Sequence, residues 1–104
     1  MDETLKRIKR AIIAGHYQFS IKALIELDAA GLGESDALEA ILTAGEIYKT
    51  IRSTSPHRSR RREYLHVIIG STLDGTPVYT KGKLVVTSGI ETYYFLVSSK
   101  RASD

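Results

Sequence analysis

The chain has 104 residues, of which 42% are hydrophobic, and its 15 Lys and Arg against 12 Asp and Glu give a net charge of +3. One core suits this length, so we expect a single domain over residues 1–104. The absence of cysteine excludes disulfides and cysteine-based metal sites. No apolar run approaches the ~20 residues of a membrane span, and the start lacks a signal-peptide pattern, so we expect a cytoplasmic protein with no membrane contact.

The first half of the chain is predicted to form three helices. Their core-facing positions are apolar residues at helical spacing: Leu5, Ile8, Ile12 and Ile13, then Ile21, Leu24 and Ile25, then Leu38, Ile41 and Leu42. Ser20 and Ser35 are the candidate N-caps of the second and third helices. Glycines at positions 15, 31, 33 and 45 are expected to end the three helices.

The second half is predicted to form about four antiparallel strands, over residues 46–52, 64–71, 77–86 and 92–99. Alternation in the first strand places Lys49 and Ile51 on one face. Asp74-Gly75 is a typical hairpin turn, Ser88-Gly89 is a second turn, and residues 101–104 are expected to fray. Helices followed by strands indicate an α+β fold, with the three helices packed on one face of the sheet.

Charge is divided unevenly along the chain. Residues 1–46 hold 5 basic and 8 acidic side chains, a net charge of −3, whereas residues 47–104 hold 10 basic and 4 acidic ones, a net charge of +6. The densest basic stretch runs from Arg52 to Arg62. This asymmetry favours a surface for a polyanion on the second half, although basic clusters are most often plain solvated surface.

Metal, cofactor and helix-turn-helix interpretations are disfavoured. The three histidines, at positions 16, 57 and 66, have no metal-ligand spacing and no paired carboxylates beside them, so we expect no metal and no cofactor. Residues 20–44 do read as helix, turn and helix. The second of these helices carries acidic side chains and no basic one, which would repel DNA phosphates.

Metal-independent RNA cleavage is the chemistry that the remaining polar residues suit. Such cleavage needs a group that accepts the 2′-hydroxyl proton, a group that protonates the leaving 5′-oxygen, and cations that stabilise charge on the phosphorane. Tyr79 and Lys81 lie two residues apart, so they share a face of their strand. Each residue alone also fits a purely structural role, because tyrosines in strands commonly pack against neighbouring side chains and lysines in strands commonly protect the edge of a sheet from aggregation.

The order of these residues resembles the motility quorum-sensing regulator (MqsR) family of toxins, over about residues 5–100. The resemblance rests on these segments: Ala14-Gly15, Ser20 to Leu24, Asp28 to Leu32, Ile47-Tyr48-Lys49-Thr50, His57, Tyr64, Val78-Tyr79-Thr80-Lys81 and Val97-Ser98-Ser99-Lys100. It implies a RelE-like fold and ribosome-independent cleavage of single-stranded messenger RNA without metal, leaving a 2′,3′-cyclic phosphate. It also implies a cognate antitoxin partner, which usually carries its own zinc-binding domain.

The resemblance also implies roles for individual residues. The family's functional lysines fall on Lys49 and Lys100, its functional tyrosine falls on Tyr79, and the position of its functional glutamine is held by Arg61. Arginine cannot accept a hydrogen bond, so an acceptor role at this position is lost, whereas bidentate phosphate binding is retained. We expect the RNA backbone to be held by further residues: His57, Arg58, Arg60, Arg62, Lys81 and Lys83.

Two other functions remain open at this point. The same fold suits a non-catalytic RNA- or ribosome-binding module, which the arginine at position 61 would favour. A protein-interaction domain whose basic loop docks an acidic partner is the other alternative. The oligomeric state, the preferred cleavage sequence and the identities of the general acid and base are not predicted.

Overall fold

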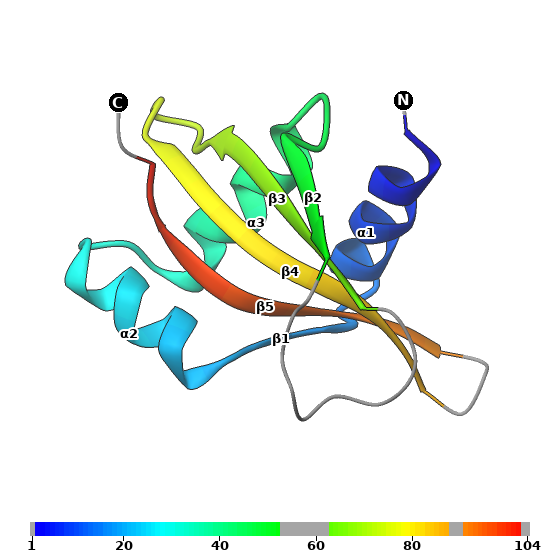
Figure 1. The fold of residues 1–104 in the computed structure, drawn as a ribbon. Helices are drawn as coiled ribbons and strands as arrows, with labels where there is room; N and C mark the ends of the chain where they lie inside the picture. The colour runs from blue at the N-terminus through cyan, green and yellow to red at the C-terminus, as the bar shows by residue number, and fades with distance from the viewer. Residues whose placement is uncertain (1, 53–62, 88–90, 103–104) are drawn as a thin grey trace.

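The structure is a computed structural model that describes residues 2–52, 63–87 and 91–102. Within these residues the chain forms three helices and five strands: α1 (Glu3–Ile13), β1 (Tyr17–Phe19), α2 (Ile21–Ala29), α3 (Glu34–Thr43), β2 (Lys49–Arg52), β3 (Tyr64–Ser71), β4 (Pro77–Thr87) and β5 (Glu91–Arg101). The strands form one sheet in the order β1-β5-β4-β3-β2. The α+β class is therefore confirmed, with helices and sheet arranged as Figure 1 shows. None of the helices in these ranges is long and apolar enough to cross a membrane.

The sheet has one more strand than the sequence predicted. Strands β2 to β5 are antiparallel, as expected, but β1 adds to the free edge of β5 in parallel, with Tyr17 opposite Tyr94 and Phe19 opposite Leu96. The prediction of four strands is wrong because a segment of three residues is too short to show a strand periodicity. The position of β1 depends on its pairing with β5, 77 residues later in the chain. The residues of β1 and their immediate neighbours do not encode that pairing.

Helices α1 and α3 cover one face of the sheet. They join β3 and β5 in a core that contains Leu5, Ile8, Ile41, Ile68 and Leu96, all fully buried. Helix α3 approaches β3 so closely that a Cβ built on Gly70 would lie 1.9 Å from the carbonyl oxygen of Ala40. Only glycine fits this position, and the contact fixes α3 against the sheet.

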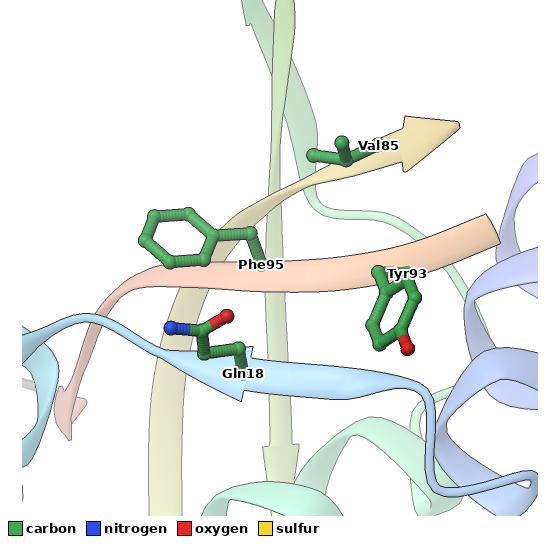
Figure 2. Close-up of a pocket in the computed structure, with 4 residues that line it drawn as sticks. All are labelled: Gln18, Val85, Tyr93 and Phe95. Atoms are coloured by element: carbon green, nitrogen blue, oxygen red, sulfur yellow. The ribbon is translucent and has the colours of Figure 1, made fainter. Parts of the chain in front are cut away.

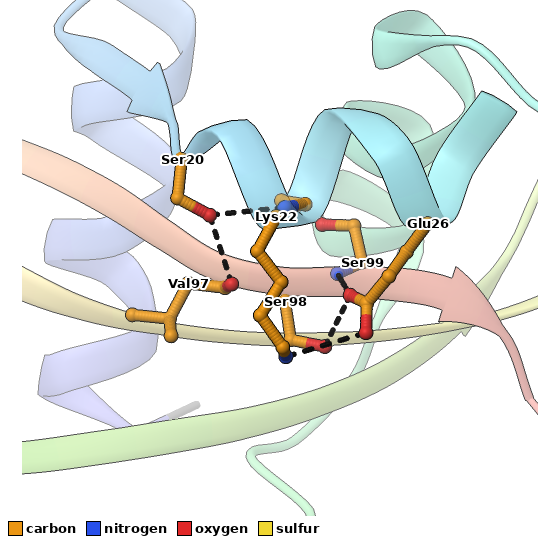
Figure 3. A network of polar contacts seen from close by, with 7 residues as sticks. Ser20, Lys22, Glu26, Val97, Ser98 and Ser99 are labelled. Atoms are coloured by element: carbon orange, nitrogen blue, oxygen red, sulfur yellow. Dashed lines mark hydrogen bonds and ion pairs between the residues drawn. The ribbon is translucent and has the colours of Figure 1, made fainter.

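Helix α2 packs differently, along the edge of β5 where β1 has ended. The Ser20 hydroxyl donates to the carbonyl of Val97 at 2.9 Å, and the Glu26 carboxylate accepts from the Ser98 hydroxyl at 2.7 Å and from the Ser99 amide at 3.1 Å (Figure 3). A strand edge otherwise presents unpaired backbone groups, and α2 satisfies them here. The prediction that all three helices pack on one sheet face is therefore wrong for α2.

Several predicted core positions are exposed. Ile13 at the end of α1 is 76% exposed, and on α2 Ile21 and Ile25 are 77% and 64% exposed. The buried positions of α2 are Ala23 and Leu27 instead. Because α2 meets the edge of β5 through Ser20 and Glu26 and turns only Ala23 and Leu27 toward the core, the side chains of Ile21 and Ile25 point away from it.

The predicted N-cap of α2 is confirmed, and the predicted N-cap of α3 is wrong. Ser20 is the N-cap of α2, and its hydroxyl accepts from the Ala23 amide at 3.0 Å. Ser35 is not a cap, because the N-cap of α3 is Gly33, two residues earlier. The Gly33 amide donates to the Asp36 carboxylate at 2.8 Å. An acidic side chain in the first turn also suits the helix dipole.

The predicted strand limits are close to the observed ones. Strand β3 matches, β4 extends by one residue, and the Asp74-Gly75 turn joins them, with Gly75 at a φ of +88°. Strand β2 begins only at Lys49, and β5 continues to Arg101, so the expected fraying at 101 is wrong. The Ser88-Gly89 turn lies outside the described residues.

Candidate functional site

The residues proposed from the sequence converge on the face of the sheet turned away from α1 and α3, which we call the outer face. In β3, Ile68 and Gly70 point toward the helices, so Val67 and Ile69 point to the outer face. Residues directly opposite in an antiparallel pair share a face. Lys49 and Lys81 both pair with Val67, and Tyr79 pairs with Ile69 and Lys100, so all four predicted residues lie on the outer face.

Tyr79 and Lys100 are brought into direct contact. They are opposite each other on β4 and β5, and the Lys100 ammonium lies 5.3 Å from the centre of the Tyr79 ring. This distance is within the range of a cation–π interaction. Lys100 is exposed and Tyr79 is half-buried, so solvent reaches part of each of these adjacent residues.

Lys49 extends the site across the sheet. Two strand spacings separate it from Lys81 in the same row, which corresponds to roughly 10 Å between backbones. Lys100 lies three strand spacings away and two residues further along the sheet, which corresponds to roughly 16 Å. Lys49 and Lys81 therefore lie in one row across the strands, and Lys100 lies in the next row beside Tyr79, so the three cations form a bent line over the outer face. Such a line suits several phosphates of an extended strand better than one phosphate in a closed pocket.

Lys83 continues the outer face along β4, two residues beyond Lys81. Its ammonium pairs with the Glu63 carboxylate at 3.2 Å, and both side chains are partly exposed. The carboxylate offsets part of this lysine's charge, so Lys83 contributes less to phosphate binding than a lysine without such a neighbour. Among the ranges described, Lys49, Lys81 and Lys100 form no ion pair with a carboxylate.

A β-bulge decides which residues of β5 reach the outer face. Lys81 pairs with Ser98 but Gly82 pairs with Leu96, so the register shifts by one residue between them. Strict alternation would put Phe95 and Lys100 on opposite faces, and the bulge puts both on the outer face. Gly82 is required beside the bulge because a Cβ there would lie 2.7 Å from the Tyr94 ring.

Five of the sequence-predicted site residues belong to the segment between β2 and β3 that the structure does not describe. His57, Arg58, Arg60, Arg61 and Arg62 lie outside the described residues. Their roles therefore stay predictions from the sequence and the resemblance. Three of the four proposed catalytic residues, at positions 49, 79 and 100, share the outer face, and the fourth position is not described.

A pocket that the sequence reasoning missed lies further along the same face. It has a volume of about 380 Å³ and is lined by Gln18 of β1, Val85 of β4, and Tyr93 and Phe95 of β5 (Figure 2). The alternation of Tyr93 and Phe95 was the available signal, because two aromatic residues at a spacing of two share a strand face. The contribution of Gln18 depends on β1, which was not predicted.

His66 is not part of the outer face. It pairs with Gly82 and Thr50 on the helix-covered side, where its Nδ1 lies 3.1 Å from the Thr50 hydroxyl. Burial lowers the pKa of His66, and the charge of Asp2 opposes that shift only in part. This imidazole therefore stays away from an RNA strand on the outer face.

The described residues offer no grouping of three His, Asp or Glu side chains that would hold a metal ion. The chemistry available on the outer face is instead that of ammonium groups, a phenol and aromatic rings. Comparison of the chain with protein families, with curated proteins and with solved structures finds no match.

Proposed function

We propose that this protein is a metal-independent endoribonuclease that cleaves single-stranded messenger RNA, as toxins of toxin–antitoxin pairs do. The observation that carries the proposal is the placement of Tyr79 against Lys100 on the same sheet face as Lys81 and Lys49. The resemblance to the MqsR family, which names three of these four positions, points to the same activity. A RelE-like fold belongs to this proposal as well.

The chemistry is an internal transfer within the RNA. The 2′-oxygen attacks the adjacent phosphorus and loses its proton, the bond from phosphorus to the 5′-oxygen breaks, and the 5′-oxygen gains a proton. The products are a 2′,3′-cyclic phosphate and a 5′-hydroxyl. Lys100 and Lys49 stabilise negative charge on phosphate oxygens, and the Tyr79 hydroxyl hydrogen-bonds the reacting group or passes a proton. Arg61 holds the backbone in this proposal.

The test is cleavage of an end-labelled single-stranded RNA in the presence of a chelator, resolved on a denaturing gel. Wild-type protein is expected to give discrete fragments with cyclic-phosphate ends. Tyr79→Phe and Lys49→Ala are expected to lower the rate by about 100-fold or more, within the range of general acid–base and charge stabilisation. Thermal unfolding should stay within a few degrees of wild type, because Lys49 is exposed and Tyr79→Phe keeps the aromatic ring and removes only a hydroxyl.

Matched variants control for non-specific effects. Tyr64→Phe removes a hydroxyl from β3 on the helix-covered side, where Tyr64 pairs with Arg52, and Lys6→Ala removes an exposed charge from α1. Both are expected to cleave as wild type does. Normal cleavage by Tyr79→Phe and Lys49→Ala would refute the assignment of the site.

A second candidate function is binding of single-stranded RNA without cleavage. The line of lysines across the strands favours it, because spaced cations suit several phosphates and do not by themselves supply a proton acceptor. A gel shift without fragments would support this function over the first. Absence of both a shift and fragments would exclude the two RNA functions and leave the protein-interaction domain.

A further inference from the structure

The pocket between Tyr93, Phe95 and Gln18 has no role in the cleavage chemistry, yet it opens on the same outer face. We propose that it is a nucleobase-binding subsite that holds one base of a single-stranded RNA whose backbone follows the lysines. This inference rests on the proposed RNA function and adds to it the recognition of a base rather than of phosphate alone.

The lining of the pocket is mainly apolar, with one polar side chain. Two aromatic side chains from β5 and one aliphatic side chain from β4 surround a volume of about 380 Å³, and a single amide, that of Gln18, supplies polarity. Predominantly apolar walls with few polar groups are typical of small-molecule sites of roughly 300–1,000 Å³. An amide carries both donors and an acceptor, which matches the mixed edge of a nucleobase.

One of the two aromatic side chains, Tyr93, packs against a neighbouring ring outside the pocket lining. The Tyr93 ring lies 5.2 Å from the His16 ring, centre to centre, at an interplanar angle of 33°. The adjacent Tyr94 amide donates to the His16 carbonyl at 2.9 Å. Tyr93 and Phe95 are both half-buried, so part of each ring is free to contact a base.

The position of the pocket links it to the cations. Phe95 lies opposite Lys83 on β4, and Lys83 is four residues from Tyr79 on the same face, which corresponds to roughly 13 Å. Aromatic rings beside a cationic track are the combination by which proteins bind single strands, because stacking accepts any base while the cations hold the backbone. A base in the pocket would therefore set the register of the strand relative to Tyr79.

The test compares two strands that the protein cannot cleave: a fluorescent 2′-O-methyl RNA and an abasic phosphodiester of the same length. Binding is measured by fluorescence anisotropy at constant salt. We expect wild-type protein to bind the base-bearing strand about 5- to 100-fold more tightly, as stacking of one base would give. Phe95→Leu, which keeps an apolar side chain but removes the ring, should lose most of this difference. Tyr64→Leu, an aromatic change on the helix-covered side, should keep it.

The outcomes separate this inference from the proposed function. Equal binding of the two strands by wild type would overturn the base subsite and leave cation-mediated RNA binding standing. Retention of the full difference by Phe95→Leu would also overturn the subsite. No binding of either strand would overturn both proposals.

Discussion

Gly70 offers the sharpest test of how the helices and the sheet are arranged. A methyl group at this position would lie 1.9 Å from the Ala40 carbonyl oxygen and 2.7 Å from its carbonyl carbon. Ordinary contact begins at 3.4 Å, so α3 and β3 would have to separate by about 1.5 Å. The obstructing atoms belong to the backbone, so no side-chain rotation relieves the overlap.

The expected cost of Gly70→Ala follows from that separation. Overpacking of a close-packed core costs roughly 1–3 kcal/mol. A gap of even 0.5–1 Å removes about a quarter to a half of each dispersion contact along the interface. Ala37 and Ile41 of α3 are fully buried there and would lose such contacts. We therefore expect the free energy of unfolding to fall by about 3 kcal/mol or more, a large part of the roughly 5–15 kcal/mol typical of a domain.

The measurement is urea unfolding followed by far-ultraviolet circular dichroism. Gly45→Ala is the matched control, because a Cβ on Gly45 meets nothing within 4 Å and its φ is not in the left-handed region. That variant should lie within about 1 kcal/mol of wild type. A Gly70→Ala protein as stable as the Gly45→Ala protein would show that α3 does not contact β3 as described.

Three further predictions concern Glu26, Ser99 and Lys81. Burial disfavours the Glu26 carboxylate, but hydrogen bonds from β5 and the Lys22 ion pair at 3.2 Å prevail and lower its pKa below 4.5. Glu26→Gln should lower the free energy of unfolding by about 1–2 kcal/mol at pH 7. A carboxyl whose pKa is lowered by folding stabilises fully above its ordinary pKa of 4.5, and this contribution is lost as the pH falls through the folded-state pKa. The difference in unfolding free energy between the two proteins should therefore shrink as the pH falls below 4.5, and a constant difference would refute this linkage. The Ser99 hydroxyl is buried and has no hydrogen-bond partner among the described residues. The Tm of Ser99→Ala should therefore equal or exceed that of wild type. A clear decrease in Tm would contradict the absence of a partner. Lys81→Gln should flatten the slope of log affinity against log salt for a single strand by about 0.7, whereas Lys6→Gln should not.

The sequence predicted those parts of the fold that depend on local pattern. The Asp74-Gly75 turn and the strand around Ile68 follow from turn chemistry and β-rich composition, and both are confirmed. The Ser20 cap follows from the affinity of a hydroxyl for free amides at a helix start, and it too is confirmed. Each of these features is determined within a few residues.

The parts that the sequence did not predict depend on contacts between distant segments. Strand β1 forms through its pairing with β5, in which Phe19 lies opposite Leu96. The orientation of α2 is set by Glu26, whose carboxylate accepts a hydrogen bond from the Ser99 amide at the edge of β5. Apolar periodicity alone placed Ile21 and Ile25 inward, although both are exposed. A helix with apolar residues around much of its circumference does not reveal which side meets the core.

In the candidate site, too, some features follow from local sequence pattern and others depend on contacts between distant segments. Alternation placed Tyr79 and Lys81 on one face, and the structure agrees. The bulge beside Gly82 was not predictable from alternation, and it alone brings Lys100 and Phe95 to the same face. The resemblance indicated Lys49, Tyr79 and Lys100 without a geometric reason, and the pairing of the strands supplies that reason.

The most direct test of the account is a map of where a single strand binds. Backbone amide shifts of the isotope-labelled protein are followed by NMR during titration with an uncleavable 2′-O-methyl RNA. We expect the largest shifts at residues of the outer face, including Lys49, Tyr79, Lys81, Phe95 and Lys100, with small shifts in α1 and α3. Shifts concentrated on the helices, or none at saturating RNA, would contradict the claim that the outer face is the RNA-binding surface.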